Sequence, residues 1–120
     1  MNARTPGPIL EKSRPPVSVL DFSRDELLSW LSDRVAGRVE KAYLFGSVVD
    51  GSARPWSDLD VLLVADTDKP FIERGLDYQD LLDLGVAMDL LVYTPAEFER
   101  LVSSDSGFWR CFRERHLRVR

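Results

Sequence analysis

A nearly continuous apolar run, Leu59–Ala65, is the feature that most restricts how this chain can fold. Such a run, broken only by Asp60, is typical of a β-strand that other elements cover on both faces. The chain has 120 residues, of which 44% are hydrophobic, so one compact domain can supply that cover. We expect a two- or three-layer core with no room for a separate substrate domain, so an active site must lie open or be completed by a partner.

Apolar periodicity and capping signals predict the other elements. The predicted strands are 39–45, 86–93 and a short edge strand 117–119, and the predicted helices are 23–37, 71–84, 94–102 and 108–115. Ser23 and Glu26 have the spacing of a capping box, in which each side chain satisfies the other residue's free backbone N–H. Thr94 and Glu97 repeat this spacing. The element order predicts an α/β (α+β) fold, a short mixed β-sheet of three or four strands flanked by helices.

The N-terminal residues differ in composition from the rest of the chain. Residues 1–16 contain four prolines and show little periodicity, which is typical of a flexible tail or of a strap lying on a domain. We expect the folded domain to occupy residues 17–120, with Val17–Phe22 as a short extended lead-in.

The net charge, the lengths of the apolar runs and the cysteine count argue against several classes of protein. A net charge of −4 disfavours general binding to nucleic acid backbones, which requires a basic surface. No apolar run approaches the roughly 18 residues of a membrane span, and the polar N-terminus lacks a signal-peptide stretch. The single cysteine, Cys111, excludes an intrachain disulfide and is expected to pack against the core. A cytoplasmic protein is the resulting expectation.

Three aspartates stand at informative positions on the predicted strands. Asp58 and Asp60 flank the start of the central strand, where alternate residues point to the same face. Asp89 lies inside the apolar strand that follows, where an unpaired carboxylate would be costly to desolvate. Three converging acids would repel one another unless a cation lay between them, and Mg²⁺ prefers such oxygen ligands while leaving positions open for phosphates.

A Gly-Ser pair directly after the first predicted strand indicates where phosphates could bind. Gly46 allows the backbone to approach a ligand closely, and Ser47 adds a hydroxyl donor. If Ser47 opens a short helical turn, free N–H groups would point at the phosphates.

Each of these features also has a simpler structural explanation. Gly46-Ser47 could be an ordinary turn, Asp58 and Asp60 a solvated strand entry, and Asp89 the ion-pair partner of a nearby arginine. The joint arrangement of these residues is much more specific than its parts.

The residues resemble a known family. Gly46-Ser47, ten further residues and then Asp58-Leu59-Asp60 match the GS-x10-D-x-D signature of the DNA polymerase beta nucleotidyltransferase superfamily. The stretches LFGSVVDGSARPWSDLDVLLV and VAMDLLVYTPAEFERL are similar to the minimal nucleotidyltransferase (MNT) family. The resemblance covers roughly residues 23–120.

The resemblance implies a nucleotidyltransferase site with two Mg²⁺ ions and ATP. Asp58 and Asp60 would hold both ions, and Asp89 would be the third carboxylate, a ligand of the catalytic metal and a candidate base for the incoming hydroxyl. Gly46 and Ser47 would bind the triphosphate. Many MNT proteins are antitoxins of a HEPN-domain RNase toxin, and some transfer AMP from ATP to a tyrosine of that toxin. The implied partner is therefore a HEPN toxin. Separately, the chain could form a homodimer or a hetero-oligomer.

The sequence departs from this family at the positions after Gly-Ser. Family members often carry arginines there, whereas this chain has Val48, Val49 and Asp50. Arg54 could compensate as a nucleotide-binding cation. The alternative is a protein that neutralises the toxin by contact alone. A transferase acting on a small molecule is a third reading, which the short chain disfavours.

Two further features have open interpretations. Trp56 could stack on a base or pack its loop onto the domain. The arginines of the C-terminus could form a docking surface for an acidic partner or RNA, or simply a solvated helix face. They are Arg110, Arg113, Arg115, Arg118 and Arg120. His116, the single histidine, has no assigned role.

Overall fold

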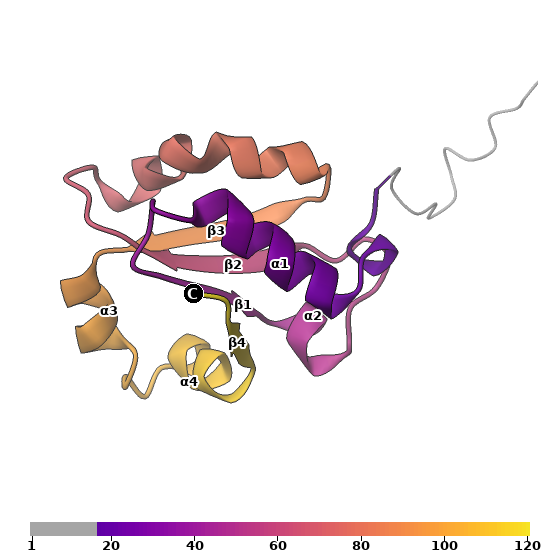
Figure 1. Cartoon of the computed structure of the whole chain (residues 1–120). Coiled ribbons are helices and arrows are strands. Elements are labelled where there is room, and N and C mark those ends of the chain that lie inside the picture. The colour runs from indigo at the N-terminus through magenta and orange to yellow at the C-terminus, as the bar shows by residue number, and fades with distance from the viewer. Residues whose placement is uncertain (1–16) are drawn as a thin grey trace, which may run out of the picture.

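The computed structural model describes residues 17–120, which form a four-stranded sheet flanked by helical segments (Figure 1). The strands are β1 (Lys41–Phe45), β2 (Leu59–Val64), β3 (Met88–Tyr93) and β4 (His116–Arg118). Their order across the sheet is β3-β2-β1-β4. β1 pairs antiparallel with both β2 and β4, whereas β2 and β3 are parallel. The predicted mixed sheet is confirmed, and its central β2 has five of six residues buried.

The helical segments are four α-helices and two 3-10 segments, of which the second, η3, is the longest helical segment within residues 17–120. They are η2 (Val19–Asp21), α1 (Arg24–Val35), α2 (Ser47–Asp50), η3 (Phe71–Leu84), α3 (Pro95–Leu101) and α4 (Gly107–Glu114). Both predicted capping boxes are present: Ser23 and Glu26 cap α1, and Thr94 and Glu97 cap α3. No helix within residues 17–120 is long and apolar enough to cross a membrane.

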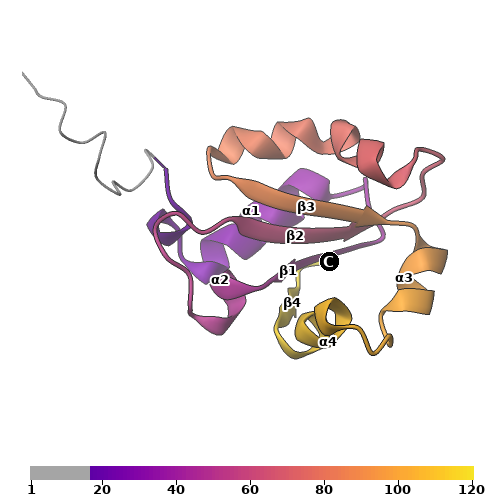
Figure 2. The ribbon, with the colours of Figure 1, turned by 180° about the vertical axis from the view of Figure 1, so that it is seen from behind.

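The sheet separates two hydrophobic layers because successive strand residues point to opposite faces. Val61 and Leu63 of β2 pack in a first layer with side chains of α1 and η3. Leu62 and Val64 pack in a second layer with Phe98 of α3 and with Trp109 and Phe112 of α4. In both Figure 1 and Figure 2, α3 and α4 lie near each other on the side away from the salmon-coloured η3.

Three expectations from the sequence differ from the structure. Val17–Phe22 is not extended, because Ser18 and Asp21 form a capping box that closes the 3-10 turn η2. Residues 71–84 form a 3-10 segment with a kink at Tyr78 rather than a regular α-helix. Cys111 is exposed and does not pack in the core, because its helix turns Trp109 and Phe112 inward. The predicted proline-rich tail, 1–16, lies outside the described residues.

Candidate active site

The candidate site lies where the end of β1 meets the beginnings of β2 and β3. Asp60 is paired with Phe45 across β1 and β2, and it is paired with Asp89 across β2 and β3. Val61 and Leu63 face the first layer, so Asp60 projects from the opposite face, on which α3 and α4 pack further along the strands. Register partners in a parallel pair point to the same face, so β2 and β3 bring the carboxylates of Asp60 and Asp89 together.

Asp60 is the member of the three that is desolvated. It is partly buried, whereas Asp58 and Asp89 are exposed. Burial raises the pKa of Asp60 to about 6, and the neighbouring charges of Asp89 and then Asp58 add to the rise. From the sequence, we expected burial to disfavour the ionised carboxylate of Asp89. In the structure Asp89 lies near the exposed end of β3, and the carboxylate that burial disfavours is that of Asp60.

The carboxylates carry uncompensated negative charge. Within the described residues 17–120, none of the three forms an ion pair or accepts a hydrogen bond, so no arginine neutralises Asp89 there. Side chains in that part of the chain do not form a ready-made group of three or more metal ligands. The donor chemistry nevertheless fits Mg²⁺, because the site offers carboxylate oxygens whose mutual repulsion a hard cation would relieve.

Gly46 brings the backbone of the first loop against Asp60. It has φ 80° and ψ −146°, a conformation that glycine adopts readily and other residues rarely do. A Cβ atom at this position would collide with Oδ2 of Asp60, so the close approach depends on glycine. Ser47 is the first residue of α2, which confirms that a short helical turn opens here.

The residues that replace the family's arginines have structural roles. Val48 and Val49 pack against the first hydrophobic layer. The Asp50 carboxylate accepts hydrogen bonds from the Ser52 backbone N–H at 2.9 Å and hydroxyl at 2.6 Å, and it forms an ion pair with Arg115 at 2.8 Å. These contacts, first those with Ser52, lower the pKa of Asp50. Its charge is therefore partly neutralised within the domain.

Arg54 and Trp56 lie on the exposed loop between α2 and β2. The Arg54 backbone N–H donates to the Ser57 hydroxyl, while its guanidinium contacts no described residue through an ion pair or hydrogen bond. Trp56 is 55% exposed and lines a pocket of about 450 Å³ together with residues 85–87. The Ser18 hydroxyl, not Trp56, ties this loop to the domain, because it donates to the Pro55 carbonyl at 2.6 Å.

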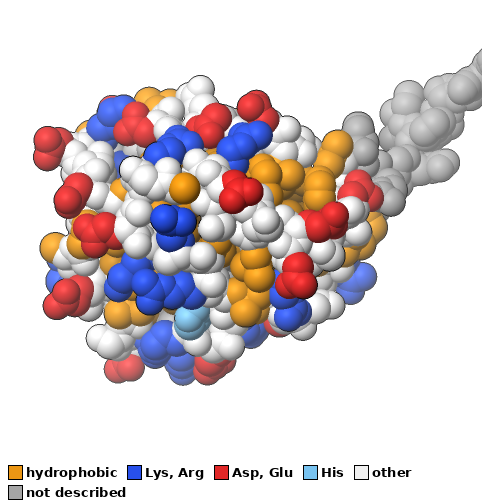
Figure 3. Space-filling view, viewed as in Figure 1, with side chains coloured by type: hydrophobic (Ala, Val, Ile, Leu, Met, Phe, Trp, Pro, Cys, Tyr) orange, Lys and Arg blue, Asp and Glu red, His pale blue; other side chains and the backbone are white. Residues whose placement is uncertain are grey.

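The C-terminal arginines largely make internal contacts. Arg113 donates to the carbonyls of Val102 and Ser104, and Arg110 donates to that of Asp105. Figure 3 shows basic side chains gathered near the single histidine, with acidic side chains around them. Sequence reasoning treated Arg115 only as part of this basic group. It did not predict that Arg115 reaches the loop of Gly46, because that contact depends on the pairing of β1 with β4.

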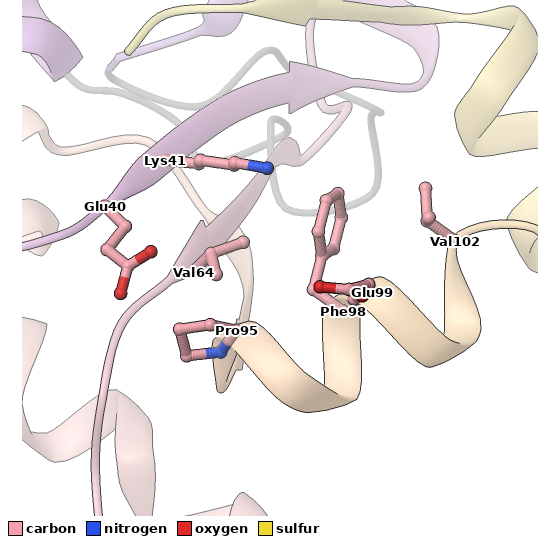
Figure 4. A pocket seen from close by; sticks show the side chains of 7 residues that line it. All are labelled: Glu40, Lys41, Val64, Pro95, Phe98, Glu99 and Val102. Atoms are coloured by element: carbon pink, nitrogen blue, oxygen red, sulfur yellow. The ribbon is translucent and has the colours of Figure 1, made fainter.

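A second pocket lies at the opposite end of β1 and β2 (Figure 4). Its volume is about 220 Å³. The lining residues are Glu40, Lys41, Val64, Pro95, Phe98, Glu99 and Val102. Lys41 places its ammonium 5.4 Å from the centre of the Phe98 ring. Since the three aspartates lie at the other end of these strands, this pocket is not part of the candidate site.

Comparisons with known proteins show the class of protein to which this fold belongs, that of the nucleotidyltransferases. The family model of the nucleotidyltransferase domain matches residues 24–109, so this chain belongs to that family. A curated protein of Methanocaldococcus jannaschii, named "putative protein adenylyltransferase", is 31% identical over 78 residues, which are 65% of this chain and 77% of that protein.

Two solved structures are similar in fold. One is a toxin–antitoxin with AMP-PNP, with a TM-score of 0.54 and 21% identity over 82% of this chain and 73% of that one. The other is a mutant of the toxin–antitoxin MntA-HpeT, with a TM-score of 0.52 and 20% identity over 80% of this chain and 71% of that one. At this identity the likeness concerns the fold alone.

Proposed function

We propose that this chain transfers AMP from ATP to a hydroxyl of a partner protein, namely a tyrosine of a HEPN toxin, and so acts as an antitoxin. The observation that carries the proposal is the register pairing of Asp60 with Asp89 beside Gly46. The name of the archaeal relative supports protein adenylylation, and the two solved structures of similar fold are toxin–antitoxins. We further infer that residues 17–120 form the catalytic domain and that it works in the cytoplasm.

The proposed roles follow from the positions of the side chains. Asp58, Asp60 and Asp89 would hold Mg²⁺, which supplies charge neutralisation at the attacking and leaving oxygens when it is bound. Gly46 lets the loop backbone lie against Asp60, so a phosphate bound at this loop would be close to the metal-binding carboxylates, and Ser47 offers its hydroxyl as a donor. Arg54, exposed on the next loop, would add positive charge to nucleotide binding.

The proposed reaction conserves atoms and charge. The tyrosine oxygen attacks the α-phosphorus of ATP, a new P–O bond forms, and the bond to the β-phosphate oxygen breaks. Pyrophosphate leaves, and the tyrosine proton passes to the exposed carboxylate of Asp89. Residues 17–120 contain one small domain, so the partner would supply the acceptor and cover the open side of the site.

The second candidate is neutralisation of the toxin by binding alone. It is favoured by α2 itself, which carries Val48, Val49 and Asp50 and therefore offers no cation of its own to a triphosphate. In that case the aspartates would have no part in toxin suppression.

Calorimetric titration of ATP with Mg²⁺ tests the proposal. The wild-type chain should bind ATP only when Mg²⁺ is present, and the double variant Asp58→Asn, Asp60→Asn should not bind. The variant should remain folded, because burial and two neighbouring carboxylates already oppose the ionised form of Asp60. The double variant Asp66→Asn, Asp105→Asn, at two exposed loop residues, is the charge-matched control and should bind as the wild type does.

Transfer is then measured with labelled ATP and the co-purified toxin. Label on a toxin tyrosine, lost in the double variant, would support the enzyme. Suppression of the toxin by the double variant, without label, would contradict it and favour binding alone.

A further inference from the structure

Arg115 lies directly beside the Gly-Ser loop although it is about 70 residues away in sequence. Its carbonyl accepts a hydrogen bond from the Gly46 N–H at 3.2 Å. The neighbouring residue, His116, is the β4 partner of Phe45 on β1. Gly46 is thus enclosed between the Asp60 carboxylate on one side and the Arg115 backbone on the other.

A weak ion pair with Asp50 of α2 holds the Arg115 side chain. Its guanidinium is 2.8 Å from the Asp50 carboxylate, and the side chains of Arg115 and Asp50 are 48% and 23% exposed. Ion pairs in contact with water contribute little to stability. Asp50 would also keep its two hydrogen bonds from Ser52 after Arg115 moved away. The guanidinium is therefore available to a stronger anion.

A cationic side chain beside Gly46 would offset part of the negative charge at the site. Three uncompensated carboxylates stand on the Asp60 side of Gly46, and a triphosphate adds further negative charge. Arg24, the other arginine bonded to α2, donates to the Val49 carbonyl and belongs to α1. Arg115 is the one whose own backbone is bonded to Gly46, and its planar fork of donors suits phosphate oxygens.

We propose that Arg115 binds the triphosphate of the nucleotide, and that its pairing with Asp50 belongs to the nucleotide-free state. The proposal rests on the proposed nucleotide site. It assigns the positive charge that α2 lacks to a residue between α4 and β4, so the C-terminal segment takes part in substrate binding.

The experiment compares binding of two probes, ATP with Mg²⁺ and inorganic tripolyphosphate with Mg²⁺, by calorimetry. Arg115→Ala should weaken binding of both about 10-fold or more, as expected for loss of a charge-assisted hydrogen bond, and Arg115→Lys should restore part of it. Asp50→Asn should bind as tightly as the wild type or more tightly, because it releases Arg115. Arg100→Ala is the control, because it removes the same charge from an exposed side chain of α3, and it should bind as the wild type does.

The two single variants separate ligand binding from a structural role. If the ion pair merely supported α2, Arg115→Ala and Asp50→Asn would lose affinity together, which would overturn the proposal. Unchanged binding in Arg115→Ala, or a loss for ATP without a loss for tripolyphosphate, would also overturn it while leaving the proposed function intact. A wild type that binds neither probe would contradict the proposed function and this inference with it.

Discussion

The position of Gly46 requires glycine for two reasons: its backbone conformation, and the lack of space for a side chain. Its φ of 80° with ψ −146° is sparsely populated by other residues, and its Cα faces the Asp60 carboxylate. Gly51 also has a positive φ, of 83°, but a Cβ there would meet nothing within 4 Å. The two glycines therefore differ in whether space, as well as conformation, is restricted.

Gly46→Ala should destabilise the chain more than Gly51→Ala. Gly51→Ala costs only the left-handed conformation, about 1–2 kcal/mol. Gly46→Ala adds the collision with Asp60 to a backbone cost of about 1–3 kcal/mol, and it should also abolish ATP binding. Urea denaturation of both variants measures the difference. Equal destabilisation would show that Asp60 moves aside without cost.

At the scale of elements, an ion pair between Arg74 and Glu97 connects η3 to α3. The Arg74 guanidinium donates to the Glu97 carboxylate at 2.6 Å and to the Val92 carbonyl at 3.1 Å, and its side chain is only 9% exposed. Arg74 first, and then the Thr94 N–H of the capping box, hold the pKa of Glu97 at about 2. One carboxylate thus caps a helix and neutralises a buried cation.

Glu97→Gln should lower stability in a pH-dependent way. A carboxyl group whose pKa is lowered in the folded state stabilises that state above its unfolded pKa, and the contribution is lost as pH falls through the folded value. We expect a cost of roughly 2 kcal/mol at pH 7 that disappears between about pH 5 and pH 2. Urea denaturation at several pH values measures it. Glu99→Gln, exposed on the same helix, is the control, and a cost independent of pH would contradict the ionic origin.

The elements that could be predicted from sequence are those with local causes. Capping boxes at Ser23 and Thr94 depend on residues three positions apart, and the central strand depends on its own apolar run. The kink at Tyr78 has no such local signal, because apolar spacing does not separate an α-helix from 3-10 turns. Likewise, spacing identified the candidate aspartates and Gly46, whereas the contact of Arg115 needed the long-range pairing of β1 with β4.

At the scale of the whole molecule, β2 joins the two hydrophobic layers. Its side chains point alternately into the two layers. If one layer lost its packing, one face of β2 would be exposed, and the strand that supports the other layer would be destabilised. A single domain of this length is expected to unfold in one cooperative transition.

Core truncation in either layer should therefore destabilise the whole domain. We expect Leu31→Ala, in the first layer, to cost about 2–5 kcal/mol and Phe112→Ala, in the second, about 3–5 kcal/mol. Ile72→Ala, at a side chain 88% exposed, should change stability by less than about 0.5 kcal/mol.

The coupling between the two layers can be measured through the fluorescence of Trp109, which lies in the second layer. Urea unfolding is followed in a variant in which Trp30 and Trp56 are replaced by Phe, so that only Trp109 reports the transition. Leu31→Ala should shift the Trp109 transition although Leu31 lies in the other layer. An unshifted Trp109 transition would mean that the layers unfold separately.

The parallel pairing of β2 with β3 has a consequence for how such a chain can diverge. Asp60 and Asp89 are brought together by ladder hydrogen bonds between their strands, not by the 23 residues from Ala65 to Ala87 that connect them. That connection can be lengthened, shortened or exchanged while the pairing of Asp60 with Asp89 stays constant. Surfaces for new partners can thus arise on η3 without disturbing that pairing, whereas a slip of one residue between the strands would separate the two carboxylates.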